Sequence, residues 1–295
     1  MTLEQLRIFV CVAEREHMTA AARTLNVTQS AVSAAIAALE ARHGVRLFHR
    51  VGRGIVLTEA GTLFLAEARV ILDRVHAAEA MLDDLSGLKR GTLRVVASQT
   101  IAAYWLPPLL AAFRERFPHI EIVLEIGNTT QVAAHVQAGK YDLGIVEGQV
   151  DNPALAHWPI AQDQLVLVQS TPFGAQGCTV EYLQKARWVM REQGSGTRST
   201  LNDYLGQIGV KPGSLNEVLV LPSNESVRTA VEAGAGIAGL SSLVVAPALA
   251  AGLLHAAPVA FGPRVFFALR HKERYRSQAV EALTDFIAQR SVAGD

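Results

Sequence analysis

Cysteine is scarce in this chain: only Cys11 and Cys178 occur among its 295 residues. We expect the two to lie in different domains, which excludes a disulfide framework. Each thiol is expected to be buried and inert, with a redox-sensing role as the alternative. Long apolar runs are missing as well, and no basic segment followed by an apolar one opens the chain. We therefore expect a soluble, cytoplasmic protein.

The chain also lacks the residue patterns of common catalytic sites. No pair of His or Cys has the spacing of metal ligands, and no G-x-S-x-G motif occurs. Ser98 and Ser195 have no histidine near them in the fold that we predict. Neither an enzyme nor a bound metal or cofactor is predicted. Half of the residues are hydrophobic, which is enough for the cores of two or three domains.

The stretch 18–40, MTAAARTLNVTQSAVSAAIAALE, predicts two short helices joined by a tight turn at Asn26. Thr28 is placed to cap the second helix. One apolar stripe of that helix is expected to be buried: Val32, Ile36 and Leu39. The opposite side carries short polar side chains that can reach base edges or phosphates, as a recognition helix requires: Gln29, Ser30 and Ser33. Ordinary packing in an all-α domain is the alternative interpretation.

Excess charge of either sign is missing too, because 27 basic residues balance 27 acidic ones. A DNA-binding protein of this composition must concentrate its positive charge locally. No acidic residue occurs between Ala41 and Thr58, and that stretch holds Arg42, His43, Arg46, His49, Arg50 and Arg53. Within it, 45–50 and 55–57 read as two strands around a glycine turn, a wing with Arg53 at its tip for a phosphate or the minor groove. A solvated charged loop is the alternative.

A long helix is predicted from about Thr58 up to Gly87. Apolar residues recur along it at steps of four and three: Phe64, Ala68, Ile71, Val75, Ala78, Leu82 and Leu85. One small domain should not bury such a seam, so we expect a coiled-coil dimer that places two DNA-binding domains side by side on DNA. Packing of the helix on its own domain is the alternative.

Strands alternate with helices after Gly91, which predicts a doubly wound parallel sheet in two lobes. The whole is an α+β multidomain protein: a winged helix-turn-helix at 1–58, a coiled-coil linker helix at 59–88 and a two-lobe α/β domain of the periplasmic-binding-protein type at 91–295. We place lobe I at 91–162 and 266–295 and lobe II at 163–265, with crossovers near Gln162 and Phe261.

Polar residues follow the predicted strands where such sheets bind ligands. The candidates are Ser98, Gln99, Thr100, Thr129, Glu147, Gly194, Ser195, Gly196 and Thr197, with 222–225 nearby. Hydroxyls and free amides at helix starts favour a small oxyanion or carboxylate, although ordinary helix caps are the alternative. Glu147 would repel an anion unless it is protonated, paired with a cation such as Arg198, or meets a donor. We hypothesise that it accepts a hydrogen bond from a protonated oxyanion or an amino group.

The segments TAAARTLNVTQSAVSAAIAALE and LFHRVGRGIVLTEAG, followed by a two-lobe α/β region, resemble LysR-type transcriptional regulators over essentially the whole chain. EGQ, REQGSGTR and SNESVRTAVEAGAGIAGLS are similar to the branch that regulates sulfur assimilation and carbon fixation, including sulfite- and sulfate-responsive members. The resemblance implies a homotetramer that binds double-stranded operator DNA near a divergent promoter. A small anion, such as sulfite, sulfate or a short carboxylate, would change DNA bending and act on RNA polymerase indirectly.

By motif match, the resemblance assigns DNA contact to Thr28, Gln29, Ser30, Ser33, Arg50 and Arg53. It assigns effector contact to Ser98, Thr100, Thr129, Glu147, Ser195, Gly196 and Thr197. Many members carry Arg and Gln where this chain has Ala34 and Ala35, so more specificity is expected from Gln29, the wing and DNA shape. A solute-binding receptor is the alternative function, but such a receptor would not need a basic winged helix-turn-helix domain.

Overall fold

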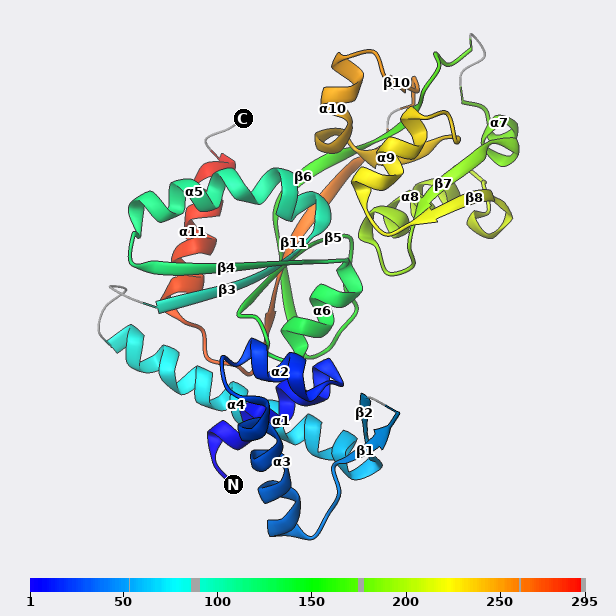
Figure 1. The fold of residues 1–295 in the computed structure, drawn as a ribbon. Helices are drawn as coiled ribbons and strands as arrows, with labels where there is room; N and C mark the ends of the chain where they lie inside the picture. The colour runs from blue at the N-terminus through cyan, green and yellow to red at the C-terminus, as the bar shows by residue number, and fades with distance from the viewer. Residues whose placement is uncertain (53, 86–90, 175–177, 260, 293–295) are drawn as a thin grey trace. The chain divides into compact units, whose positions relative to one another are not determined.

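The computed structural model describes residues 1–52, 54–85, 91–174, 178–259 and 261–292. The predicted wing tip, Arg53, and the predicted end of the linker helix, Gly87 to Arg90, lie outside these residues. The chain divides into two compact units, Met1–Leu82 and Asp83–Asp295, which are described separately (Figure 1). No helix among the described residues is long and apolar enough to cross a membrane.

The first unit is a winged helix-turn-helix. Its elements are α1 (Leu3–Arg15), α2 (Met18–Thr24), α3 (Gln29–His43), the antiparallel strands β1 (Phe48–Val51) and β2 (Gly54–Leu57), and α4 (Glu59–Leu85). Asn26 turns the chain between α2 and α3 with φ of 54°. The predicted stripe Val32, Ile36 and Leu39 is buried in α3, so its polar face is turned outward.

Helix α4 packs on its own unit through its first half, which is contrary to our expectation. Ala68 is fully buried, and Phe64 and Ile71 join the core that α1, α2 and α3 form. The rings of Phe9 and Phe64 have centroids 4.8 Å apart. The physical reason is that α1 lies along α4, as the ion pairs Arg69–Glu14 and Arg7–Glu79 indicate; this part of the seam is therefore shielded without a second copy.

Lobe I of the second unit is a sheet between two helical layers. Its strands are β3 (Gly91–Ser98), β4 (Ile120–Gly127), β5 (Leu143–Glu147), β6 (Leu155–Gln169) and β11 (Pro263–His271). Its helices are the π-helix η1 (Ile101–Trp105), α5 (Leu106–Arg116), α6 (Thr129–Gln137) and α11 (Gln278–Val292). Alternating residues of β3 separate the layers: Val95 packs with the α5 and α11 side, and Val96 with α6.

The sheet is mixed, so the expectation of a purely parallel sheet was wrong. Strand β3 lies parallel to β4 and β5, but β11 runs antiparallel to both β5 and β6. The physical reason is that β6 leaves lobe I and β11 returns to it. Two such connecting strands that pair side by side must run in opposite directions.

Lobe II has a small sheet between α7 (Val180–Lys185) and α8 (Gly196–Gln207) on one side and α9 (Asn224–Glu232) and α10 (Ser242–Ala250) on the other. Strands β7 (Arg187–Arg191) and β8 (Asn216–Leu221) are parallel. Strands β9 (Ala238–Ser241) and β10 (His255–Ala256) pair antiparallel with β6, and the 3₁₀ turn η2 spans Pro212–Ser214. Strand β6 therefore belongs to both lobes.

Candidate functional site

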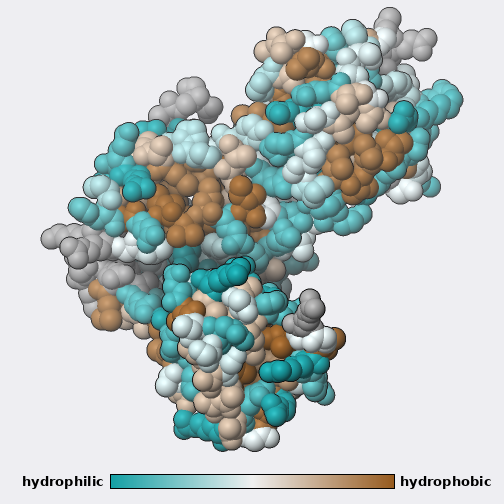
Figure 2. All heavy atoms as spheres, in the orientation of Figure 1, coloured by the Kyte–Doolittle hydropathy of each residue, from teal (hydrophilic) through white to brown (hydrophobic). Residues whose placement is uncertain are grey.

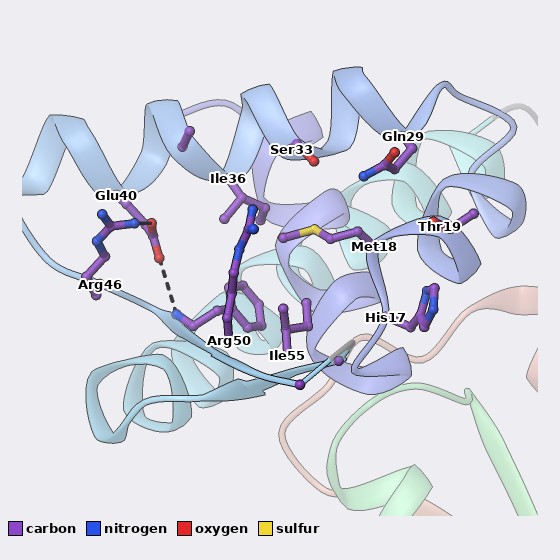
Figure 3. Close-up of a pocket in the computed structure, with 14 residues that line it drawn as sticks. His17, Met18, Thr19, Gln29, Ser33, Ile36, Glu40, Arg46, Arg50 and Ile55 are labelled. Carbon is purple, nitrogen blue, oxygen red and sulfur yellow. Dashed lines mark hydrogen bonds and ion pairs between the residues drawn. The ribbon is translucent and has the colours of Figure 1, made fainter.

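A groove of about 460 Å³ lies between α2, α3 and the two strands of the wing (Figure 3). Gln29 and Ser33 line it from α3, and Arg50 lines it from β1. The side chain of Arg50 extends from the strand toward α3 in Figure 3. The groove thus brings two polar residues of the predicted recognition helix beside one arginine of the wing.

The N-terminus of α3 is held by Thr28, whose Oγ1 accepts a hydrogen bond of 3.2 Å from the backbone N of Ala31. The hydroxyl of Ser30 lies 2.9 Å from the same Oγ1. Thr28 therefore has the structural role of a cap as well as an exposed position at the helix start, where free amides favour a phosphate.

Glu40 fixes the wing relative to α3, a role that the sequence analysis missed. Its Oε1 accepts hydrogen bonds from the backbone N of Leu47 at 2.7 Å and of Phe48 at 3.2 Å, and Oε2 pairs with Arg46 (Figure 3). The signal in the sequence was a lone carboxylate just before a basic stretch. The distance between recognition helix and wing is therefore set inside the unit.

Glu147 is the centre of a second site, in the second unit, where the two lobes meet. The Ser98 hydroxyl donates to Oε2 of Glu147, and the Thr197 hydroxyl donates to Oε1 at 3.3 Å. The Thr129 hydroxyl donates to the Glu147 backbone carbonyl at 3.1 Å. These four residues are buried and come from β3, α6, β5 and α8. The polar clusters that the sequence analysis singled out therefore face one another.

Gly196 is a point of close approach between the backbones of the two lobes in this site. A Cβ on Gly196 would lie 2.3 Å from the Glu147 carbonyl oxygen and 2.5 Å from Thr129 Oγ1. Gly194 makes a neighbouring contact, because its carbonyl accepts a 3.2 Å hydrogen bond from the backbone N of Thr130. Ser195, between the two glycines, is buried at the start of α8.

Gln99 and Thr100 join the lobes beside the Glu147 cluster. The Gln99 amide bridges the Pro222 carbonyl, at 2.8 Å, and the backbone N of Asn224, at 3.0 Å. The Asn224 side chain donates to Thr100 Oγ1 at 3.0 Å. Polar contacts across the lobes thus flank the buried centre.

The cation beside Glu147 is Arg264 and not Arg198, which the sequence analysis named as an example of a pairing cation. Arg264 Nη1 lies 3.6 Å from Glu147 Oε1. The guanidinium of Arg198 is directed instead to Glu217, at 2.6 Å, and to the Arg191 carbonyl, because α8 turns it away from the cleft. Burial would lower the pKa of Arg264, but the hydrogen bonds and charge of Asp163 and the charge of Glu147 raise it. The guanidinium therefore stays charged.

Burial disfavours the reactive thiolate form of both cysteines. Both are half-buried, and burial is the main factor that raises the pKa of Cys11 and of Cys178. Among the described residues, no group of three or more His, Cys, Asp or Glu could hold a metal ion.

A winged helix-turn-helix unit followed by a two-lobe α/β unit with a polar interlobe site defines a ligand-responsive DNA-binding regulator. Two family models match this chain: that of bacterial regulatory helix-turn-helix proteins of the lysR family at residues 3–62, and that of the LysR substrate binding domain at residues 86–291. The chain therefore belongs to the LysR family of transcriptional regulators. It is a DNA-binding regulator with an effector-binding domain.

The relatives extend over nearly the full length. The uncharacterized HTH-type transcriptional regulator YeiE of Escherichia coli (strain K12) is 33% identical over 290 residues, 97% of each chain. A probable RuBisCO transcriptional regulator of Cyanophora paradoxa is 32% identical over 97% of this chain and 91% of its own. The structure of full-length CbnR complexed with its target DNA has the same fold, with a TM-score of 0.69 and 23% identity over 99% of this chain and 100% of the other. The similarity to the carbon-fixation branch is confirmed.

Proposed function

We propose that this protein regulates transcription by binding operator DNA through α3 and the wing, and that a small oxyanion or carboxylate between the lobes modulates this binding. The observation that carries the proposal is the convergence of Ser98, Thr129 and Thr197 on one buried point shared by both lobes. The activity proposed is cytoplasmic regulation rather than catalysis. As working domain boundaries we retain 1–58, 59–88 and 91–295.

On the DNA side, α3 presents Gln29 and Ser30 to the major groove, with Thr28 at the helix start and Ser33 one turn on. Arg50 supplies a positive charge for the phosphate backbone from the wing. Because Ala34 and Ala35 offer no long polar side chains, base readout rests mainly on Gln29 and on DNA shape. Arg53 stays a proposed phosphate or minor-groove contact.

On the ligand side, the class is a small anion such as sulfite, sulfate or a short carboxylate. Hydroxyls and the N-terminal amides of α8 supply hydrogen-bond donors around the site. Glu147 accepts a hydrogen bond from a protonated oxyanion or an amino group, which favours ligands that carry a donor. Gln99, Thr100, Gly194, Ser195 and Gly196 complete the proposed site.

Assembly as a homodimer, and of two dimers as a homotetramer, is supported by apolar side chains at exposed positions. On α4 these are Leu63, Val70, Met81 and Leu82. On the outermost strands of the two lobes they are Val123 and Ile126 of β4, and Leu219 and Val220 of β8. Figure 2 shows apolar areas on the surface of both lobes. A ligand that shifts the population of lobe orientations would change the geometry of such an assembly on DNA, and thereby RNA polymerase access.

The DNA assignment is tested on a genomic operator fragment selected by the purified full-length protein. Binding is measured by fluorescence anisotropy at several salt concentrations, for the wild type, Arg50→Ala and Gln29→Ala. Arg50→Ala should weaken binding to all sequences and reduce the salt slope by about one phosphate contact. Gln29→Ala should weaken preference for the operator over random DNA.

Arg69→Ala on α4 is the control, since Arg69 pairs with Glu14. An unchanged salt slope in Arg50→Ala would overturn the wing assignment.

The ligand assignment is tested by a thermal-shift screen of sodium sulfite, sulfate, phosphate and acetate. A ligand of the folded state stabilises it by about 2.7 kcal/mol at a concentration one hundred times its Kd. The active anion should also change operator affinity. A screen in which no small anion raises the melting temperature or alters DNA binding would overturn an anion-responsive cleft and leave the DNA assignment intact.

A further inference from the structure

Arg264 is a fully buried arginine at the point where the lobes are hinged. It lies on β11 directly opposite Asp163 on β6, so the pair joins the two strands that connect the lobes. Its Nε donates to Asp163 Oδ1 at 2.7 Å, and its Nη2 pairs with Oδ2. The Ser241 hydroxyl donates to the same Asp163 carboxylate. This half of the guanidinium is therefore firmly held.

The remaining nitrogen of Arg264 faces the Glu147 cluster. Nη1 donates to Thr197 Oγ1 at 3.0 Å and lies 3.6 Å from Glu147 Oε1. Arg264 thus lies on one connecting strand, β11, and pairs with Asp163 on the other, β6. The same guanidinium contacts lobe I through Glu147 and lobe II through Thr197. Its pair with Glu147 is a single long contact, whereas its pair with Asp163 is bidentate. Of the two pairs, the one with Glu147 is the exchangeable one.

The Glu147 carboxylate occupies the position expected for a bound anion. Its oxygens accept from the hydroxyls of Ser98 and Thr197, which are the donors proposed to bind the ligand, and it lies beside the cation. The buried cluster holds one positive charge, on Arg264, against two carboxylates, Asp163 and Glu147. A further fully ionised anion is disfavoured there as long as Glu147 keeps its negative charge in place.

We infer that Arg264 is the residue with which the ligand's anionic group pairs, and that Glu147 is an internal anion that competes for it. A ligand anion displaces the Glu147 carboxylate from Nη1, Ser98 and Thr197, while Asp163 holds the guanidinium in place. The displaced carboxylate then accepts the proposed hydrogen bond when the ligand carries a donor; sulfate carries none, so for sulfate Glu147 acts only as a competitor. When the Glu147 carboxylate is displaced, lobe I loses its contact with Arg264 on β11. Ligand binding thereby changes the contacts at the strands that connect the lobes. This inference rests on the proposed anion-responsive function and names the specificity-determining pair within it.

The test measures sulfate binding to the full chain by titration calorimetry. Glu147→Gln removes the competing charge at nearly constant shape and should tighten sulfate binding about tenfold or more. Arg264→Gln should weaken sulfate binding by a similar factor. Arg264→Lys should have an intermediate affinity for sulfate, because one ammonium cannot form two hydrogen bonds to Asp163 and also reach the ligand. In the Arg264→Gln background, Glu147→Gln should bring little gain, since the competition is for Arg264.

Two further variants separate this role from a structural one. Arg264→Gln leaves Asp163 buried and unpaired, so the double variant Arg264→Gln with Asp163→Asn, which removes both charges, shows whether a folded chain without the guanidinium still binds sulfate. Arg198→Gln is the matched control: it is the residue next to Thr197 and is also buried, but its guanidinium is bonded to Glu217. Sulfate affinity should stay within about twofold in this control.

The outcomes distinguish the inference from the function on which it rests. Binding that is measurable in the wild type, tightens in Glu147→Gln and is lost with Arg264 supports the inference. Equal sulfate affinity in the wild type and in the folded Arg264 variants would overturn the inference alone. Failure of both the wild type and Glu147→Gln to bind sulfate, phosphate or acetate would overturn the anion-responsive function together with the inference.

Discussion

A single missing side chain, that of Gly196, allows the two lobes to meet at the proposed ligand site. The Glu147 carbonyl oxygen is main chain and cannot rotate away from a Cβ placed 2.3 Å from it. Gly196→Ala must therefore separate Gly196 from β5 or strain the start of α8. We expect a loss of about 1–3 kcal/mol of stability, seen as a lower melting temperature, and a weaker response to the small anion.

Gly206 offers a matched control on the same helix. A Cβ there would meet nothing within 4 Å, so Gly206→Ala should be neutral or stabilise α8 by up to about 1 kcal/mol. Equal melting temperatures for the two alanine variants would contradict the close approach at Gly196. The comparison isolates the site because both substitutions change helix propensity in the same direction.

Sequence alone predicted which polar residues meet between the lobes better than how they pair. Ser98, Thr129 and Glu147 end strands or begin helices of lobe I, and parallel strand ends meet at one edge of a sheet, so their convergence follows from topology. Arg264 was missed because it lies inside a strand, where a charged residue usually faces water. Only the register of β11 against β6 places it beside Asp163 and in the site.

Glu192, directly after β7 of lobe II, contacts Asn128, the residue that caps α6 of lobe I. Its carboxylate accepts two hydrogen bonds of 2.8 Å from Arg191 and one of 3.2 Å from Asn128. Burial acts to raise the pKa of Glu192, but the Arg191 hydrogen bond and charge outweigh it, and the net shift is downward. The interaction is therefore at full strength above the ordinary glutamate pKa of about 4.3, and is lost as pH falls through the lower folded value.

Substitution of Glu192 should accordingly give a pH-dependent loss of stability. Glu192→Gln keeps the shape but removes the charge, so its melting temperature should lie below that of the wild type at neutral pH. The difference should shrink once the pH is below about 4.3, because the wild-type carboxylate is then becoming neutral as well. Melting curves by circular dichroism from about pH 7 downward provide the measurement. A difference that is constant with pH would contradict the lowered pKa of Glu192.

At the scale of elements, the spacing of apolar residues predicted where the helices lie, but not which neighbour covers the apolar face of each helix. The seam through Phe64, Ala68 and Ile71 was read as a dimer contact, yet these residues pack against the core around Phe9. Leu63 and Val70, one heptad apart, are left exposed on another face of α4. A helical pattern shows that a face is apolar, whereas the neighbour that covers it depends on tertiary packing.

At the scale of the whole molecule, the order of elements in the sequence was enough to predict two lobes with two crossovers. It did not predict that the crossovers pair with each other. Strands β6 and β11 form one antiparallel ribbon from His271 opposite Leu155 to Pro263 opposite Gln164. The expectation of a parallel sheet came from local alternation of strands and helices, which carries no information on a strand that returns from a distant segment.

The exposed apolar face of α4 predicts that the chain self-associates through this helix. The side chains of Leu63 and Val70 are 68% and 51% exposed, and burying both against a second copy would remove an apolar stripe from water. Leu63→Lys combined with Val70→Lys should shift the mass measured by light scattering toward the monomer. The double variant should also bind the operator more weakly, because the DNA-binding units of two copies are then no longer held together. Leu253→Lys, at an equally exposed apolar position after α10, should leave the mass unchanged. A dimeric or tetrameric mass in the double variant would place the contact elsewhere, with the exposed edges at Ile126 and Val220 as the next positions to substitute.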